Sequence, residues 1–575
     1  MATADESAWG RVGSLRWEGE PVGARRLSLM WRLVFALVAV AVLAAACGND
    51  DDEAAPDDDA PPAEPGDDND ENDVDDEVAD FDPDGVIRIG AEILPTVAST
   101  QFDPTQMLSP ATSPHRLVYG TLLTARMDGS YDPGLAESAE VVDNQTITIQ
   151  IREDVVFSDD TPFDAEAVKF GLDRNFAADN PGALALAEFE AVEEVTVDGP
   201  LTVSIHFSEP VAGSFFPLLA LGETMIVSPT AVEEGVDLQT DPVGAGPFVL
   251  ESLEMERRMV FTKNDLYWDA DNVRVAGVEM VHTAGTEAAI NAMQTDTVDI
   301  MHAASTQARE ALDGIPGLVI DAQPTDTNLF WGQLCKSDPP LDDVRVRQAL
   351  NYGLDRDQLN EVIFDGQSLP MWGVNLPDNP WHNPELDGIY ERDLDRAREL
   401  LEEAGYPDGF SIEVIVPAAG AGGGQADSVR FTELVQGQWA EIGVDVEIVP
   451  SADFVGEFFI DNQYPLLFFN LQQEGLGRIT RTLVPGSIGN ICNWDDPELN
   501  ALVDEIRKLA PDSPEAIELW QELDYHITAE TAAQIFGVFA IESTIWNDDR
   551  LGNLTFWRNF QGQPMIDATQ TYVKR

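Results

Sequence analysis

The sequence predicts an α/β protein with at least two lobes. Its 575 residues exceed what one hydrophobic core usually accommodates, so two or more lobes are expected. In both halves of the chain, segments with strand-like alternation are followed by segments with helical spacing and then by strands again. This order is typical of parallel strands joined by crossover helices, which indicates the α/β class.

The charge balance excludes one large class of function. The chain carries 105 acidic and 32 basic residues, a formal net charge of −73. A protein that neutralises phosphates needs lysine and arginine on one face, so nucleic-acid binding is not expected. Between Asp50 and Asp84 there are 19 acidic residues and no basic one, but the acidity also extends over the rest of the chain. Its simplest role is solubility, with salt screening relieving the self-repulsion.

An apolar run near the N-terminus indicates export. Residues Leu33–Ala46 are apolar and follow several arginines, and 14 residues are too few for a stable membrane-spanning helix. Small residues directly before Cys47 resemble a lipobox. Leu43 lies four residues before the cysteine, whereas the leucine of that motif usually lies three residues before it. We expect a signal peptide over residues 1–46 and lipid attachment at Cys47, with plain cleavage nearby as the alternative.

The next segment, residues 47–84, is predicted to be a disordered acidic tether. It consists mainly of Asp, Glu, Pro, Ala and Asn, so it cannot bury enough apolar surface to offset its chain entropy. Such a chain would span roughly 35 Å as a random coil and roughly 125 Å when fully extended.

The stretch Thr146–Arg174 has the most distinctive pattern. Ile147, Ile149 and Ile151 alternate with polar residues, which predicts a strand. A proline-containing acidic turn follows, and Asp164 is placed to cap the helix after it. The order is therefore strand, turn and capped helix.

Further elements are expected on both sides of this stretch. Before residue 325 we expect folded sequence from Val86, hairpins over Val192–Phe207 and Val243–Trp268, and a strand, helix and strand over Val273–Met301. Later segments predict a helix within Pro339–Leu359, a helix within Arg396–Phe410 that Gly405 ends, and a crossover made of strand Ile412–Val416, helix Ser428–Glu441 and strand Val444–Val449.

These blocks together resemble a known family. Thr146–Arg174, with Tyr131–Glu140 before it, is similar to the signature region of the family 5 solute-binding proteins, the dipeptide, oligopeptide and nickel receptors of bacterial ABC importers. Val243–Trp268, Pro339–Leu359 and Gln436–Val449 resemble later segments of that family in the same order. The resemblance extends from about Gly90 to the C-terminus.

The resemblance implies a fold and a domain organisation. It implies a two-lobed periplasmic-binding-protein-like fold of type II, in the large cluster C class, with a hinge and a ligand cleft between the lobes. Residues 85–325 and 530–575 are expected to form lobe I, and residues 326–529 lobe II.

The resemblance also implies a function. It implies an extracytoplasmic receptor, most simply a monomer, that captures a peptide or similar small solute and delivers it to an ABC permease. A lipid anchor would hold it at the outer face of the cytoplasmic membrane or in the periplasm. A receptor for a nickel complex, a sugar or another small solute is the alternative within the family. A secreted lipoprotein enzyme or a sensory or adhesive surface protein is the alternative outside it.

Motifs for catalysis or metal binding were sought in the sequence and not found. There is no Gly-x-Ser-x-Gly elbow, and the six histidines form no close pair with metal-ligand spacing. The glycine-rich loop Ala418–Gln425 lacks the Gly-Lys-Ser or Gly-Lys-Thr of a phosphate-binding loop. No catalytic residue, metal or cofactor is therefore expected.

Candidate ligand contacts come from three patterns. Aromatic residues near the expected hinge commonly line a cleft, with burial in the core as the alternative. An arginine one turn into the helix after the glycine-rich loop would meet an anionic ligand group, or else form a surface salt bridge. Peptide-binding members of the family carry an aspartate after one strand, where this sequence has a loop of Gln and Glu. The candidates are Gln101, Phe330, Trp331, Trp372, Arg430, Gln472, Gln473 and Glu474, with Glu474 as the substitute for that aspartate.

Cys335 and Cys492 remain after lipidation of Cys47. An even number of cysteines in an exported protein favours a disulfide between them, with two buried free thiols as the alternative.

Overall fold

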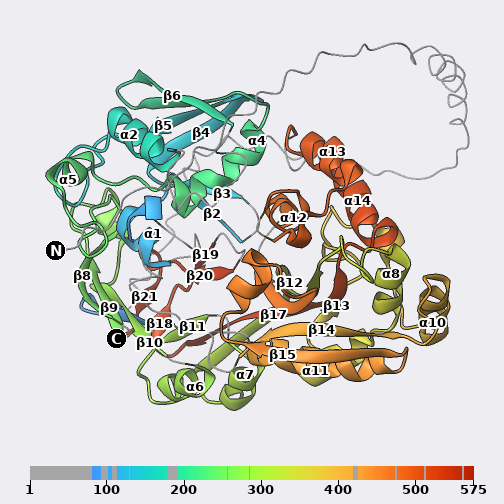
Figure 1. Ribbon diagram of the computed structural model, residues 1–575. Helices are drawn as coiled ribbons and strands as arrows, with labels where there is room; N and C mark the ends of the chain where they lie inside the picture. The colour runs from blue at the N-terminus through green and yellow to red at the C-terminus, as the bar shows by residue number, and fades with distance from the viewer. Residues whose placement is uncertain are drawn as a thin grey trace, which may run out of the picture. The chain divides into compact units, whose positions relative to one another are not determined.

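The computed structural model describes the folded part of the chain from Phe81 to the C-terminus (Figure 1). The description omits residues 92–101, 107–112, 128–129, 178–188, 190, 256, 284, 303, 419–424, 473–474, 488, 510–512 and 560–562, and the side chains of residues 106, 113, 223, 326, 425–426 and 470–472. The expected signal peptide, Cys47 and all but the last four residues of the expected tether lie outside the described residues. Among the described helices, none combines the length and apolar character needed to cross a membrane.

One mixed sheet of eleven strands organises the described part of the chain (Figure 1). Its order is β15 (Val444–Ser451), β14 (Phe410–Pro417), β16 (Leu466–Gln472), β12 (Leu318–Leu334), β17 (Ile535–Asn547), β11 (Ile300–His302), β1 (Val86–Ala91), β10 (Gly277–His282), β9 (Arg258–Lys263) and β8 (Phe248–Glu254), with β13 (Leu369–Pro370) paired to β17. β1 pairs in parallel with β10 and β11, and β14 pairs in parallel with β15 and β16. The other neighbours are antiparallel.

Two crossover units supply these parallel pairs. α6 (Thr286–Gln294) connects β10 to β11, and β1 lies between those two strands. α11 (Gln425–Ala440) connects β14 to β15, which are direct neighbours. Both units were predicted from the alternation of strand and helix patterns, and the structure confirms them.

A second sheet contains the stretch with the most distinctive sequence pattern. Its order is β4 (Ala136–Asp143), β5 (Thr146–Ile151), β7 (Thr202–Phe207) and β6 (Val192–Gly199), and all pairs are antiparallel. The three isoleucines of β5 are fully buried, as their alternation predicts. α2 (Ala165–Asn175) packs on β6 and β7, and the Asp164 carboxylate accepts a hydrogen bond of 3.0 Å from the backbone N–H of Ala167. The predicted strand and capped helix are confirmed.

The remaining elements complete the two halves of the chain. The helices are α1 (Ser113–Tyr119), α4 (Ala212–Phe215), α5 (Pro229–Glu234), α7 (Thr306–Leu312), α8 (Val344–Tyr352), α9 (Arg356–Phe364), α10 (Leu394–Glu403), α12 (Gly475–Leu483), α13 (Pro497–Ile506) and α14 (Pro514–Tyr525). The short strands are β2 (Leu123–Ala125) with β3 (Tyr131–Pro133), β18 (Leu551–Gly552) with β21 (Tyr572–Val573), and β19 (Phe556–Arg558) with β20 (Pro564–Ile566). After α10, Gly405 has a φ of +94°, and the N–H of Tyr406 bonds to the carbonyl of Leu401, as predicted for a glycine-ended helix.

The described apolar cores divide along the sequence. Three clusters draw their fully buried members from residues 87–312 and 545–573. Three other clusters draw theirs from residues 329–540. The chain passes from the first set to the second along β12 and returns along β17, so these two strands carry both crossings.

Candidate functional site

The two crossing strands change register twice, between Pro324 and Leu329 and again between Phe330 and Trp331, and the first shift is the larger. β12 and β17 pair continuously from Leu318 opposite Asn547 to Pro324 opposite Ile541. Pairing resumes at Leu329, which leaves residues 325–328 of β12 without a paired partner on β17. Because an irregularity of this kind bends a strand pair and redirects its side chains, we built the candidate site from the residues around it.

A buried polar cluster lies at this register shift. Glu542 on β17 is 7% exposed, and its Oε2 accepts hydrogen bonds of 3.3 Å from Nδ2 of Asn328 on β12 and from Nε2 of Gln563. Gln563 is held in turn by Asn559, whose amide exchanges hydrogen bonds with the Gln563 side chain and backbone. The cluster therefore joins both crossing strands to the segment between β19 and β20.

Two acceptor atoms of this cluster lack partners. Oε1 of Glu542 and Oδ1 of Asn328 are buried and have no hydrogen-bond partner among the described residues. A buried acceptor without a partner is costly, so the cluster would gain from any hydrogen-bond donor that reached it. Both atoms are closed off from solvent in this structure.

The electrostatics of the cluster favour a proton on Glu542. Burial raises the pKa of Glu542 to about 7, although the hydrogen bonds from Gln563 and Asn328 and the charge of Arg309 act in the opposite direction. Arg309 on α7 is itself buried and donates to the carbonyl of Ala304. The Glu542 carboxyl group therefore changes charge within the neutral pH range.

The aromatic candidates on β12 lie in the core. Phe330 is 2% exposed and stacks on Phe431 with ring centroids 5.7 Å apart, and Trp331 is completely buried. The two side chains point to opposite faces of β12, and each packs into a different apolar core cluster, so both faces are covered here. In this structure neither ring is available to a ligand, and the structure therefore corrects their placement in a cleft.

Two other candidates occupy different surroundings. Trp372 is half-buried against the core, and the Arg356 guanidinium lies over its ring at 5.2 Å from the centroid. Arg430 on α11 is exposed and donates a hydrogen bond of 2.8 Å to the backbone carbonyl of Val362. Neither residue contacts the Glu542 cluster through a hydrogen bond in the described structure.

The expected glutamine and glutamate loop starts beside the cluster. The last residue of β16, Gln472, pairs with Asn328 across the sheet, so residues 473–474 follow directly from this point. The side chain of Gln472 and the whole of Gln101, Gln473 and Glu474 lie outside the described residues. Within the described residues, the sheet register places the backbone of Gln472 opposite Asn328, a member of a cluster that was not predicted.

Sequence reasoning missed Glu542, although a signal was present. β17 reads IFGVFAIESTIWN, in which Glu542 is the one charged residue of an otherwise mostly apolar strand. A carboxylate in such a strand is rarely fully buried without a partner. Its partners, Asn328 and Gln563, come from distant segments and could not be identified from the pattern.

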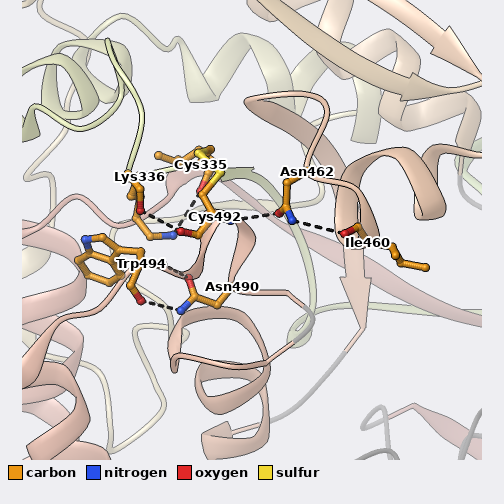
Figure 2. Close-up of a disulfide and its surroundings, with 9 residues drawn as sticks. Cys335, Lys336, Ile460, Asn462, Asn490, Cys492 and Trp494 are labelled. Carbon is orange, nitrogen blue, oxygen red and sulfur yellow. Dashed lines mark hydrogen bonds between the residues drawn. A yellow bond between two sulfur atoms is a disulfide. The ribbon is translucent and has the colours of Figure 1, made fainter. Parts of the chain in front are cut away.

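Cys335 and Cys492 form a disulfide at the far end of β12 (Figure 2). Their Cα atoms are 5.4 Å apart. Beside it, Lys336 is 2% exposed, donates only a long hydrogen bond of 3.4 Å to the carbonyl of Leu334, and lies 5.1 Å from the ring centroid of Trp494. Burial lowers the pKa of Lys336 to about 7, and the charge of Arg347 acts in the same direction.

One group of side chains has a composition that could hold a metal ion. Ligand atoms of Glu498, His526 and Glu530 lie within 4.8 Å of one another. The His526 ring nitrogens are already hydrogen-bonded to Glu530 at 2.7 Å and Asp496 at 3.1 Å. Burial opposes a charge on His526, but these carboxylates raise its pKa above the usual value. The group is explained by an imidazolium ion paired with carboxylates, and we assign no metal to it.

Comparison with known proteins identifies relatives by sequence. The family model described as bacterial extracellular solute-binding proteins, family 5 Middle, matches residues 130–474, which is more than half of the chain. The glutathione-binding protein GsiB of Salmonella paratyphi A is 30% identical over 316 residues, covering 55% of this chain and 60% of the relative. GsiB of Shigella flexneri is 29% identical over 323 residues with the same coverage. The matched region therefore spans 60% of the length of these curated relatives.

Solved structures show the same fold. AgaA from A. tumefaciens in complex with agropinic acid matches with a TM-score of 0.71 at 19% identity, covering 85% of this chain and 99% of that one. The ABC transporter-associated periplasmic binding protein DppA from Helicobacter pylori, in complex with the peptide STSA, has a TM-score of 0.71 at 18% identity, with coverages of 86% and 99%. NikA from Brucella suis in complex with Fe(III)-EDTA has a TM-score of 0.71 at 20% identity, and the match covers 85% of this chain and 100% of that one. At these identities the likeness establishes the two-lobed fold and no ligand.

Proposed function

We propose that this chain, which belongs to family 5 of the bacterial extracellular solute-binding proteins, is the receptor of an ABC importer and captures a peptide or similar small solute between two lobes. The observation that carries the proposal is the family match over residues 130–474 together with two sets of apolar cores joined by β12 and β17. A pair of crossing strands between separate cores is a suitable hinge.

The proposed lobes follow the division of the cores. Residues 85–325 form the first part of lobe I, and lobe II begins at residue 326. The sequence pattern places the return to lobe I at residue 530, whereas the buried residues of β17 up to Ala540 pack with the second set of cores. We therefore place the return at about residue 541, beside the Glu542 cluster.

The proposed mechanism is a ligand-driven shift between open and closed lobes. A ligand that contacts both lobes binds the closed form more tightly, and closure is driven only by that difference in affinity. The closed lobes then present a surface to the permease subunits. No catalytic step is part of this mechanism.

A peptide is the proposed ligand class. Its support is the family assignment, the names of the GsiB relatives and the acidic residue Glu474, which lies two positions after the end of β16 in the sequence. An acidic side chain at that place suits the α-amino group of a peptide through a charge-assisted hydrogen bond. Nickel complexes, sugars and other small solutes are the alternative ligands within the family.

Export and anchoring complete the proposal. Residues 1–46 act as a lipoprotein signal peptide, and lipid on Cys47 anchors the mature protein to the cell membrane. Residues 47–84 form an acidic tether that lets the folded part reach the permease. The receptor works as a monomer on the outer face of the cytoplasmic membrane or in the periplasm.

Calorimetric titration tests the proposal against an enzymatic role. Purified protein is titrated with glutathione, trialanine and nickel–histidine, and the solutes are recovered afterwards for mass spectrometry. A receptor binds one of these probes, or a co-purified peptide, at one molecule per protein and returns it unchanged. Chemical conversion of the solute over many turnovers would overturn the proposal.

A further inference from the structure

A small cavity within the described structure is lined by a half-buried guanidinium group that makes no ion pair with a described residue. The cavity has a volume of about 50 Å³ and lies between α1, β2 and the β19–β20 pair. Arg116 of α1 lines it, together with Thr121, Thr124, Tyr267 and Trp557. All the described lining residues belong to segments assigned to lobe I, so this cavity is separate from the Glu542 cluster at the crossing strands.

The contacts of Arg116 are with neutral groups. Its Nη1 donates to Oγ1 of Thr121 at 2.7 Å, and its Nη2 donates to Oγ1 of Thr124 at 2.8 Å. The face of the Trp557 ring lies 4.6 Å from the guanidinium carbon. A charge in such surroundings is poorly compensated, because hydroxyl groups and an aromatic face offset only part of its lost hydration.

The nearest acidic side chain is already engaged. Asp567 also lines the cavity, but its Oδ2 accepts from Arg126 at 3.2 Å and its Oδ1 accepts from the backbone N–H and hydroxyl of Thr569. Within the described part of the chain, no carboxylate forms an ion pair with Arg116. Burial lowers the pKa of Arg116, which the charge of Asp567 only partly opposes, and this direction agrees with an incompletely compensated cation.

The two threonines provide further donors. Each hydroxyl oxygen accepts a hydrogen bond from Arg116, so each hydroxyl can still donate its own proton. Neither hydroxyl donates to an acceptor among the described residues. Thr121 and Thr124 are 4% and 7% exposed, so bulk water does not supply that acceptor. Among the described residues, one cavity therefore contains a guanidinium group whose side-chain acceptors are both neutral and two hydroxyl protons that have no acceptor.

We propose that the cavity beside Arg116 binds one small monovalent anion, a halide or a short-chain carboxylate, through the Arg116 guanidinium and the hydroxyls of Thr121 and Thr124. The donor set fits an anion because all three groups can donate and the charge of Arg116 has no other counterion. The volume of about 50 Å³ suits a chloride, bromide, formate or acetate ion and is too small to enclose a larger anion. The bound ion links α1 and β2 to the C-terminal β19–β20 pair, so it stabilises the fold independently of the transported solute.

Thermal unfolding in different sodium salts tests this site. Chloride, bromide, formate and acetate are each compared with gluconate, which is too large to fit in the cavity. The sodium concentration is kept equal, because a protein with a net charge of −73 responds to ionic strength in any salt. The melting temperature is expected to be higher in at least one small anion than in gluconate. A shift with chloride and bromide identifies a halide site, and a shift with formate and acetate identifies a carboxylate site.

Two variants connect the shift to this cavity. The double substitution Thr121→Val and Thr124→Val keeps the side-chain shape and removes both hydroxyls, and it is expected to raise the half-saturating anion concentration at least tenfold. The control, Thr432→Val, removes a buried hydroxyl on α11 that bonds within its own helix, and it should leave the anion dependence unchanged. A crystal grown in bromide should show an anomalous peak beside Arg116. Equal melting temperatures of the native protein in all five salts, or density for water only in the cavity, would overturn the proposal.

Discussion

The side-chain amide of Asn328 donates a hydrogen bond of 3.3 Å to the carboxyl group of Glu542, across the point where β12 and β17 change register. Asn328 is 5% exposed and Glu542 is 7% exposed, and each has one oxygen without a partner in the described part of the chain. The contact joins the outgoing and returning strands of the proposed hinge. A change in its hydrogen bonding therefore accompanies any change in the angle between those strands.

The first prediction concerns the pH dependence that Glu542 imposes. Burial raises the pKa of Glu542 to about 7 from an ordinary value of 4.5, so the folded state binds more protons than the unfolded state between these values. The contribution of Glu542 to the free energy of unfolding therefore falls as the pH rises from 4.5 to 7, by up to roughly 3 kcal/mol at about 1.4 kcal/mol per unit. Glu542→Gln should remove this decrease in the free energy of unfolding with pH, as measured by urea unfolding at several pH values.

The control for this experiment lies on the neighbouring strand. Asp321 is exposed on β12 and pairs with Thr544 of β17, so Asp321→Asn removes a carboxylate from the same strand pair without touching the buried cluster. This variant should show the same change in the free energy of unfolding between pH 4.5 and 7 as the native protein. An identical slope in the native and Glu542→Gln proteins would show that Glu542 does not titrate there.

A second prediction concerns the lysine beside the disulfide. Burial lowers the pKa of Lys336 to about 7 from 10.5, so the unfolded state binds more protons between pH 7 and 10.5. Its contribution to stability therefore rises as the pH rises through this window. Lys336→Met replaces a buried cation by an apolar chain and is expected to increase the free energy of unfolding at pH 7 by about 1 to 4 kcal/mol.

The measurement for Lys336 is urea unfolding at pH 7 and at pH 9.5 with the disulfide intact. The gain from Lys336→Met should be smaller at the higher pH, where the native lysine is neutral when folded. Lys508→Met is the matched control, because the Lys508 side chain is 40% exposed and forms a surface ion pair with Glu505. A loss of stability in Lys336→Met at both pH values would contradict the account.

A third prediction concerns the expected anchor. Cys47→Ser should release the protein from the membrane fraction without unfolding it, because the lipid is the proposed attachment and the first strand of the fold, β1, begins at Val86. Cell fractionation followed by a salt and carbonate wash measures the release, and circular dichroism checks the fold. Continued membrane association of the variant after both washes would rule out a lipid anchor at Cys47.

A fourth prediction concerns ligand affinity. If Glu474 accepts the α-amino group of a peptide, Glu474→Gln keeps the side-chain shape and removes the charge from that hydrogen bond. A charge-assisted hydrogen bond contributes roughly 1.5 to 3 kcal/mol, so affinity should fall about tenfold to a hundredfold while the melting temperature of the empty protein hardly changes. Calorimetric titration of both proteins with the same short peptide measures this, and equal affinities would remove Glu474 from the site.

Local patterns predicted much of the fold because their physical causes are local. The buried alternation of β5 and the Asp164 cap of α2 depend on residues a few positions apart, and both were read directly from the sequence. The crossover β14–α11–β15 likewise follows from three adjacent patterns. The family resemblance then supplied the two-lobed arrangement.

The site was less predictable because its contacts join distant segments. Glu542 meets Asn328 across 214 residues of sequence, and no local pattern specifies that partner. Phe330 and Trp331 were placed in a cleft because aromatic residues near a hinge resemble cleft residues in sequence. Their burial follows from the packing of distant segments on both faces of β12, which no local pattern specifies.

The distance between the two proposed lobes, measured with and without ligand, tests the central claim most directly. Spin labels are placed through Val142→Cys on β4, at a side chain that is 58% exposed in the native protein, and Asp395→Cys on α10, whose side chain is 95% exposed. The measurement uses the Cys47→Ser form and whichever of glutathione, trialanine or the co-purified solute binds at one molecule per protein. The account predicts that saturating ligand shifts the distance distribution to shorter values and that dialysis reverses the shift. An unchanged distribution at full occupancy would contradict the claim that ligand binding closes two lobes about β12 and β17.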